Sequence, residues 1–148
     1  MKIEIEDREL LLKDLCARLP YGVKAYAKNW SKLDRKYYEG IYTVGSVHPS
    51  LNTILVCSEK GSVEIIIGYD DYEIKPYLFP LSSMTEEEKK EYRKVCELDT
   101  EILSKHPMDE TPFPALHNSQ DWLNAHHFDY RGLIPMGLAK DATGLDIY

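Results

Sequence analysis

The side chains best suited to chemistry gather in one C-terminal stretch, residues 119–139. This stretch holds two adjacent histidines, two aspartates and an arginine among large apolar residues. Imidazole titrates near neutral pH, and carboxylate and guanidinium groups recognise charged ligands. The candidate binding residues are therefore Trp122, His126, His127, Asp129 and Arg131.

A metal site in this stretch would have to use His117, Asp121 and His126, which are weak candidates. Adjacent helical residues such as His126 and His127 point about 100° apart, and Asp121 lies off the helical register of His126. We therefore expect no metal and no cofactor. A small metal- or histidine-dependent enzyme centred on His117–Asp129 is kept as an alternative.

Packing is the favoured role for the same residues. His126 follows Trp122 by one helical turn and can stack on it, while His127 suits the negative end of a helix dipole. Asp129 can cap a following turn, and Arg131 can pair with an acidic group on the sheet. The apolar residues around them are too numerous to stay in water, so we expect this tail to dock on the domain.

A second candidate site lies between Lys24 and Tyr38, where cations alternate with aromatic rings. Rings stack on bases and cations bind phosphates, which is the chemistry of single-stranded nucleic-acid binding. We interpret residues 28–39 as a loop. The net charge of −7 disfavours nucleic acid and anionic membranes as partners. The nucleic-acid candidates are Lys24, Lys28, Trp30, Arg35, Lys36 and Tyr37.

Two helices have clear signals. Asp7 is a suitable N-cap for a first helix, whose apolar stripe recurs at helical spacing: Leu11, Leu12, Leu15, Cys16 and Leu19. Thr85 followed by Glu88 is a capping box that opens a second helix. A short third helix is expected from residue 118 to about residue 127.

Five short runs rich in β-branched and aromatic residues lie between the first two helices, at residues 21–27, 41–47, 53–58, 62–68 and 73–79. Pro76 lacks an N–H and puts the last of them on an edge. This order predicts an α+β fold, with an N-terminal helix, a small, strongly bent antiparallel sheet or partial barrel of about five strands, and C-terminal helices. One domain, 1–148, is expected, in which about 85–148 is a helical part docked on the helix and strands of about 1–84.

The cysteines and the apolar runs indicate the cellular compartment. Three widely spaced cysteines, each within an apolar pattern, indicate reduced, buried thiols and a reducing cytoplasm. The first residues alternate isoleucine with charge and lack the apolar segment of a signal peptide. We expect a cytoplasmic protein with no membrane partner.

Three segments resemble a family of small uncharacterised proteins of Bacteroidetes and of their phages and prophages. They read LPYGVK (19–24), IKPYLFPLSSMT (74–85) and DWLNAHHFDYRGLIPMGLA (121–139). The resemblance implies a bacterial protein of mobile-element origin and carries no catalytic residue with it. Phe79 stands where the family pattern leads us to expect a basic residue.

The common nucleotide-binding, zinc-protease and serine-hydrolase motifs are missing from the sequence. We therefore expect a non-enzymatic accessory protein that acts through protein contacts, and a homo-oligomer is left open. The two alternatives are the histidine-dependent enzyme and the single-stranded nucleic-acid binder described above.

Overall fold

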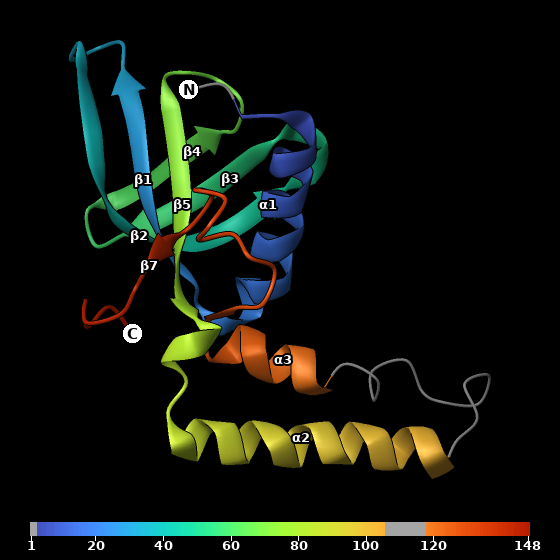
Figure 1. Ribbon diagram of the computed structural model, residues 1–148. Helices are drawn as coiled ribbons and strands as arrows, with labels where there is room; N and C mark the ends of the chain where they lie inside the picture. The colour runs from blue at the N-terminus through green and yellow to red at the C-terminus, as the bar shows by residue number, and fades with distance from the viewer. Residues whose placement is uncertain (1–2, 106–117) are drawn as a thin grey trace.

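A sheet forms the centre of the molecule, with one helix against it and two helices at one end (Figure 1). The computed structural model describes residues 3–105 and 118–148. The helices are α1 (Ile5–Arg18), α2 (Glu86–Lys105) and α3 (Asn118–Ala125), and short 3-10 helices span Leu19–Tyr21, Pro49–Leu51 and Leu81–Ser83. In the view of Figure 1, α1 stands beside the sheet, and α2 lies farther from the sheet than α3. The α+β class expected from the sequence is confirmed.

The sheet of the described chain has seven strands in the order β4-β3-β2-β1-β5-β6, with β7 also paired to β5. The longer strands are antiparallel, whereas β6 and β7 pair with β5 in parallel, so the sheet is mixed rather than wholly antiparallel, and it is not closed into a barrel. The two additional strands have two residues each, too few to leave a pattern in the sequence. The strands are β1 (Lys24–Ser31), β2 (Lys36–His48), β3 (Thr53–Ser58), β4 (Gly61–Ile66), β5 (Tyr72–Pro80), β6 (Phe128–Asp129) and β7 (Lys140–Asp141).

The segment interpreted as a loop at residues 28–39 is a β-hairpin, so that prediction is wrong. β1 runs on to Ser31, β2 begins at Lys36, and the two strands pair from Lys24↔Thr43 to Ser31↔Lys36. The polar composition of the segment pointed to a loop, but its tyrosines and Trp30 have high strand propensity. Both strands extend beyond the buried core, which explains why this part of the sheet carries so few apolar residues.

β2 changes partner along its length. Its first half pairs with β1 and its second half with β3, and a register irregularity lies between Val44 and Ser46. Gly45 occupies this bulge, where an added Cβ would meet the Cys57 sulfur at 2.9 Å. A side chain does not fit there without a shift of Cys57, and bulges of this kind bend the strand that carries them.

The interpretation that Pro76 places its strand on an edge holds for the first part of β5 in the described chain but not for its end. The strand pairs with β1 over Tyr72–Pro76, and its end pairs with β6 and β7. Pro76 lies opposite Ala25, before the parallel pairs begin, where its missing N–H interrupts no ladder in the described chain.

α1 packs its leucine stripe onto the sheet, as the spacing predicts. Leu11, Leu12 and Leu15 are buried in the main core with strand residues such as Val44 and Ile54. The helix begins at Ile5 with Glu4 at its N-cap and no side-chain cap bond, so the prediction of an Asp7 cap is wrong. Asp7 instead lies in the first turn, where its charge favours the helix dipole.

We expect Leu15→Ala to destabilise the fold by about 2–5 kcal/mol, since a fully buried leucine leaves a cavity when it is truncated. Urea unfolding followed by far-UV circular dichroism measures the change. The matched control is Lys13→Ala, an exposed position on the same helix, with an expected loss below about 0.5 kcal/mol. Equal losses for the two variants would contradict the burial of Leu15.

The capping box of α2 is confirmed atom by atom. The Thr85 hydroxyl accepts a hydrogen bond from the Glu88 N–H at 3.2 Å, and the Glu88 carboxylate accepts one from the Thr85 N–H at 3.0 Å. Two N–H groups that have no backbone acceptor at the helix start are thereby hydrogen-bonded. Glu86 in the first turn pairs with Lys89 at 3.0 Å.

Thr85→Ala is expected to cost about 1 kcal/mol, because the Glu88 N–H loses its acceptor, whereas Thr85→Ser keeps the hydroxyl and costs much less. Thermal unfolding of the three proteins measures the difference. If alanine and serine are equally destabilising, the hydroxyl is not what the position requires.

The thiols differ in setting. All three cysteines are free, Cys57 and Cys96 are half-buried, and Cys16 is exposed on α1, so the expectation that every thiol is buried is wrong for Cys16.

Within the described ranges, no helix is both long enough and apolar enough to span a bilayer.

Candidate functional site

The C-terminal histidines are held by aromatic stacking. The His126 ring lies 3.9 Å from the Trp122 ring, as predicted, and its Nδ1 is 2.8 Å from the Trp122 carbonyl. His127 stacks on Tyr148 with ring centroids 3.6 Å apart and is buried. Trp122 is itself buried in a second apolar cluster with Leu123 and Phe128. These rings therefore serve packing and do not converge on a pocket.

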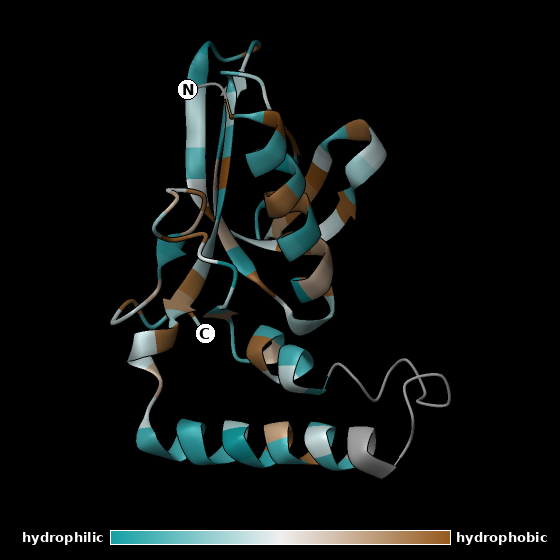
Figure 2. Cartoon of the chain, turned by 45° about the vertical axis from the view of Figure 1, so that its right-hand side comes forward, coloured by the Kyte–Doolittle hydropathy of each residue, from teal (hydrophilic) through white to brown (hydrophobic). Residues whose placement is uncertain are grey.

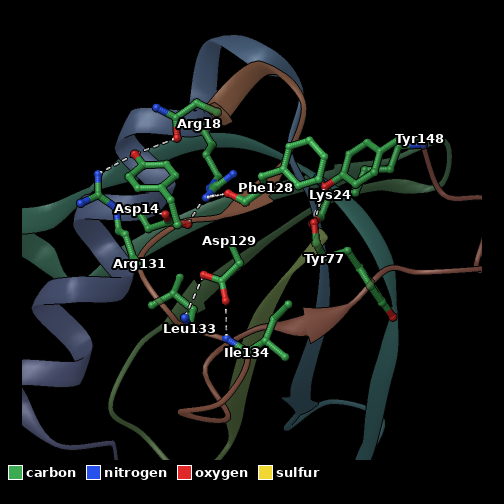
Figure 3. Close-up of polar contacts among 12 residues, drawn as sticks. Asp14, Arg18, Lys24, Tyr77, Phe128, Asp129, Arg131, Leu133, Ile134 and Tyr148 are labelled. Carbon is green, nitrogen blue, oxygen red and sulfur yellow. Dashed lines mark hydrogen bonds and ion pairs between the residues drawn. The ribbon is translucent and has the colours of Figure 1, made fainter. Parts of the chain in front are cut away.

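Asp129 caps the turn that follows it, as predicted. Its two carboxylate oxygens accept the N–H groups of Leu133 and Ile134, each at 2.9 Å (Figure 3). The turn is not an α-helix, which accommodates the proline within it, and Gly137 closes it with a φ of 76°. Leu133 is fully buried in the main core, so this capped turn anchors the tail to the domain.

A buried charge network, which the sequence interpretation missed, joins this tail to α1. Arg18 and Asp14 are both fully buried and form an ion pair at 2.8 Å, and Arg18 also donates to the Phe128 carbonyl. Arg131 pairs with the other Asp14 oxygen at 3.2 Å (Figure 3). The prediction that Arg131 pairs with an acid on the sheet is therefore wrong, because its partner lies on α1.

The signal for this network was present in the sequence. Asp14 and Arg18 fall three and seven residues after Leu11, on the same helical face as the leucine stripe. Charged residues at core positions have to be paired, because an unpaired buried charge is costly. An acid and a base at i,i+4 on an otherwise apolar face thus indicate a buried pair.

Tyr148 fastens the last described residues to the sheet. Its hydroxyl donates to the Tyr77 carbonyl at 2.7 Å and accepts the Lys24 N–H at 2.9 Å, bridging β5 and β1 (Figure 3). Lys24 Nζ donates to the Ile147 carbonyl at 2.8 Å. Burial raises the pKa of Tyr148 to about 12, so the hydroxyl keeps its proton and remains a donor.

Burial lowers the pKa of His127 to about 4, and the nearby Arg18 and His126 add to the effect. Among residues 3–105 and 118–148, its Nδ1 has no hydrogen-bond partner. A neutral, stacked imidazole with a pKa this low is a poor general base at neutral pH. The setting of His127 therefore disfavours the histidine-dependent enzyme.

We expect the free energy of unfolding to fall on acidification in a way that depends on His127. The unfolded side chain binds a proton near pH 6.5, and the folded one only near pH 4. The unfolded state thus binds more protons in this window, so the contribution is complete above about pH 6.5 and is lost as the pH falls toward about 4. Urea unfolding at several pH values measures the slope.

The control is His127→Asn, because asparagine tolerates the φ of 61° at this position and does not titrate. The slope between about pH 6.5 and about pH 4.5 should be shallower in the variant, since the remaining carboxylates titrate lower. An unchanged slope would mean that His127 is free to protonate in the folded state.

The metal candidates do not form a site within residues 3–105 and 118–148. No group of three or more histidine, cysteine or acidic side chains in these ranges is placed to hold an ion. Asp121 is exposed, and His126 is occupied by Trp122. His117 lies outside the described residues.

The nucleic-acid candidates divide between the two faces of the hairpin. Lys24, Lys28, Trp30 and Tyr37 lie on the side of the sheet away from α1, which we call the open face, together with Tyr26, Glu39 and Ile41. Trp30 and Tyr37 meet edge to face at 4.8 Å, and Lys28 lies over the Tyr37 ring. Arg35 is in the turn, and Lys36 lies over Tyr38. Three pairs, Trp30 with Tyr37, Lys28 with Tyr37 and Lys36 with Tyr38, thus contact each other within the hairpin.

One edge of the hairpin has no neighbour. β2 pairs with β1 over Lys36–Thr43, but β3 joins it only from Thr43 onward. In the described chain, no strand pairs with Lys36–Tyr42 on the side away from β1, and we call this segment the free edge. Figure 1 shows it as the outer strand of the projecting hairpin.

The direction of the backbone groups on the free edge follows from one hydrogen bond. The Val44 N–H donates to the Val23 carbonyl and so faces the β1 side. Because backbone groups alternate along a strand, the N–H and C=O of Tyr37, Glu39 and Ile41 face away from β1. These three residues offer donors and acceptors that no strand of the described chain uses.

An open groove of about 550 Å³ lies beside the free edge. Glu39–Thr43 of β2 form one side and Cys57–Lys60, at the turn between β3 and β4, form the other. Ile41 in this groove is 52% exposed, and Tyr37 farther along the edge is 48% exposed. By contrast, the largely hydrophilic helix α2 (Figure 2) offers no comparable combination of apolar side chains and unpaired backbone.

Comparisons with protein-family models, with curated proteins and with solved structures find no match to this chain.

Proposed function

We propose that this chain is a non-enzymatic interaction protein that binds an extended segment of a partner protein along the free edge of β2. The observation that carries the proposal is the run Lys36–Tyr42, paired on one side only and bordered by a groove. Unpaired edge groups form hydrogen bonds with an incoming strand, and neighbouring pockets receive its side chains. The incoming strand would continue the line of β3 beyond its turn.

The side chains of the free edge support a protein partner. Ile41, Tyr37 and Tyr38 are exposed and combine apolar surface with hydroxyl groups, a composition typical of protein interfaces. Folded proteins protect such edges with charged side chains, proline, bulges or covering segments. Lys36 and Glu39 place charges on this edge, but Lys36–Tyr42 has no proline and no bulge. A bound segment would provide that protection.

The enzymatic and nucleic-acid alternatives have less support. His126 and His127 are committed to stacking, and the aromatic rings of the hairpin contact lysines of the same hairpin. The tail of Lys24 is also used, because its Nζ binds the Ile147 carbonyl. Three free cysteines agree with action in a reducing cytoplasm, and a mobile-element origin in bacteria remains part of the proposal.

The test is a selection of short random peptides displayed on ribosomes, using the folded full chain as bait. Peptides that bind the wild type are then tested on Ile41→Pro, which removes one outward N–H and places a ring in the path of an added strand. Binding should be lost in Ile41→Pro and largely kept in Ile41→Ala, since alanine preserves the backbone donor. Glu39→Pro is the second edge variant in case the first one unfolds.

The outcomes separate the alternatives. Peptides that bind Ile41→Pro as well as the wild type, or a selection that yields none, would overturn strand addition. Titration with a labelled oligothymidylate tests the nucleic-acid alternative in parallel. Salt-dependent binding that is lost in Trp30→Ala, without any edge-dependent peptide, would assign the hairpin to nucleic acid instead.

A further inference from the structure

We infer that the segment bound at the free edge is acidic, with its carboxylates at the end that lies beside the hairpin turn. This inference rests on the proposed strand addition and adds the chemistry of the partner. It follows from the charges around the free edge, which are opposite in sign to the net charge of the whole chain.

Basic side chains cluster where the free edge begins. Lys32, Arg35 and Lys36 are all exposed at the hairpin turn. Lys36 lies over the Tyr38 ring, and its charge is near enough to Asp34 to help lower the pKa of that carboxyl. At the other end of the groove, Lys60 and Glu59 are both exposed and balance each other in charge, so the excess of positive charge lies at the hairpin turn.

The acidic residues of the hairpin are already engaged. Asp34 accepts hydrogen bonds from Tyr38 at 2.7 Å and from Ser31, and these bonds lower its pKa. Glu39 accepts the Tyr26 hydroxyl at 2.6 Å. These bonds hold the two carboxylates in the hairpin but do not neutralise them. Residues 28–39 carry four basic side chains against these two acidic ones, so the hairpin keeps a net charge of +2 that can attract a ligand.

The local charge outweighs the net charge of −7 at this site. At physiological ionic strength, charges more than about 8 Å apart are largely screened, so the distant acidic residues of α2 have little influence here. A carboxylate on an added strand would lie beside the hairpin turn, within the unscreened range. Charges at such a rim act on the choice of partner and on the rate of association.

The peptides that depend on the free edge, selected as above, test this inference through their composition and affinity. We expect an excess of aspartate and glutamate over lysine and arginine, and weaker binding as salt rises. The triple variant Lys32→Glu, Arg35→Glu, Lys36→Glu should lose about tenfold in affinity, as expected for three exposed charges turned repulsive. The control, Lys90→Glu, Arg93→Glu, Lys94→Glu on α2, makes the same change in charge and should stay within about twofold.

Each outcome has one meaning. Edge-dependent peptides without an acidic excess, or equal affinity for the wild type and the hairpin triple variant, would overturn the inference and leave strand addition standing. A selection without any edge-dependent peptide would overturn both, because the proposed function itself would fail.

Discussion

A chain that ends at residue 116 is expected to lose its native packing. The missing tail supplies Phe128, Leu133 and Leu138, all buried, and the strands β6 and β7 that pair with β5. Each large apolar side chain contributes about 1.5–3 kcal/mol on burial, and a domain has a net stability of only about 5–15 kcal/mol. The truncated chain should bind a hydrophobic dye and lose its near-UV circular dichroism while it keeps helical signal.

The matched control for this truncation ends after Ala142. It keeps the buried residues of the tail and removes the segment that carries Tyr148. The bridge from Tyr148 to β1 and β5, its stacking on His127 and the bond from Lys24 to the Ile147 carbonyl are lost. We expect a folded protein with a lowered melting temperature. A soluble chain that ends at residue 116 with an unchanged melting temperature would show that the tail does not dock.

The sequence predicted those elements whose signal is local. The leucine stripe of α1 and the Thr85–Glu88 capping box depend on residues within one or two turns, and both are found as expected. The stacking of His126 on Trp122 and the cap at Asp129 are local in the same sense. In each case spacing along the chain determines which groups meet.

What the sequence could not predict depends on segments far apart in the chain. Arg131 pairs with Asp14, and Arg18 donates to the Phe128 carbonyl, across more than a hundred residues in each case. The pairing of β6 and β7 with β5 likewise depends on how the tail docks. No spacing rule identifies such partners, although a charged pair within an apolar stripe shows that partners must exist.

The candidate site shifted for a related reason. The histidines of the C-terminal run made it the first candidate site in the sequence. In the structure both imidazoles are stacked against aromatic rings, which limits their access to a ligand. The free edge carries no catalytic residue type, and what distinguishes it is unpaired backbone, which has no signature in side-chain letters. Because residues 28–39 were interpreted as a loop, no sheet edge was expected there, and the free edge was not predicted.

The buried ion pair gives the largest effect expected from a single substitution. Asp14→Ala should cost about 3–5 kcal/mol, because it leaves the fully buried Arg18 without an acid. Arg131 loses its partner in the same change. Urea unfolding measures the loss, and the comparison is Glu86→Ala, which breaks the exposed pair with Lys89 and should cost less than about 1 kcal/mol.

Replacing both partners distinguishes a buried charge from a lost contact. The double variant Asp14→Leu, Arg18→Met fills the site with apolar groups and leaves no unpaired charge on α1, so it should be more stable than Asp14→Ala. If Asp14 matters because it holds Arg18 against the Phe128 carbonyl, the double variant should instead be less stable than Asp14→Ala, since it loses that hydrogen bond altogether. If the double variant is the less stable protein, the network holds the tail through that bond, and the desolvation of Arg18 is not what makes Asp14 necessary.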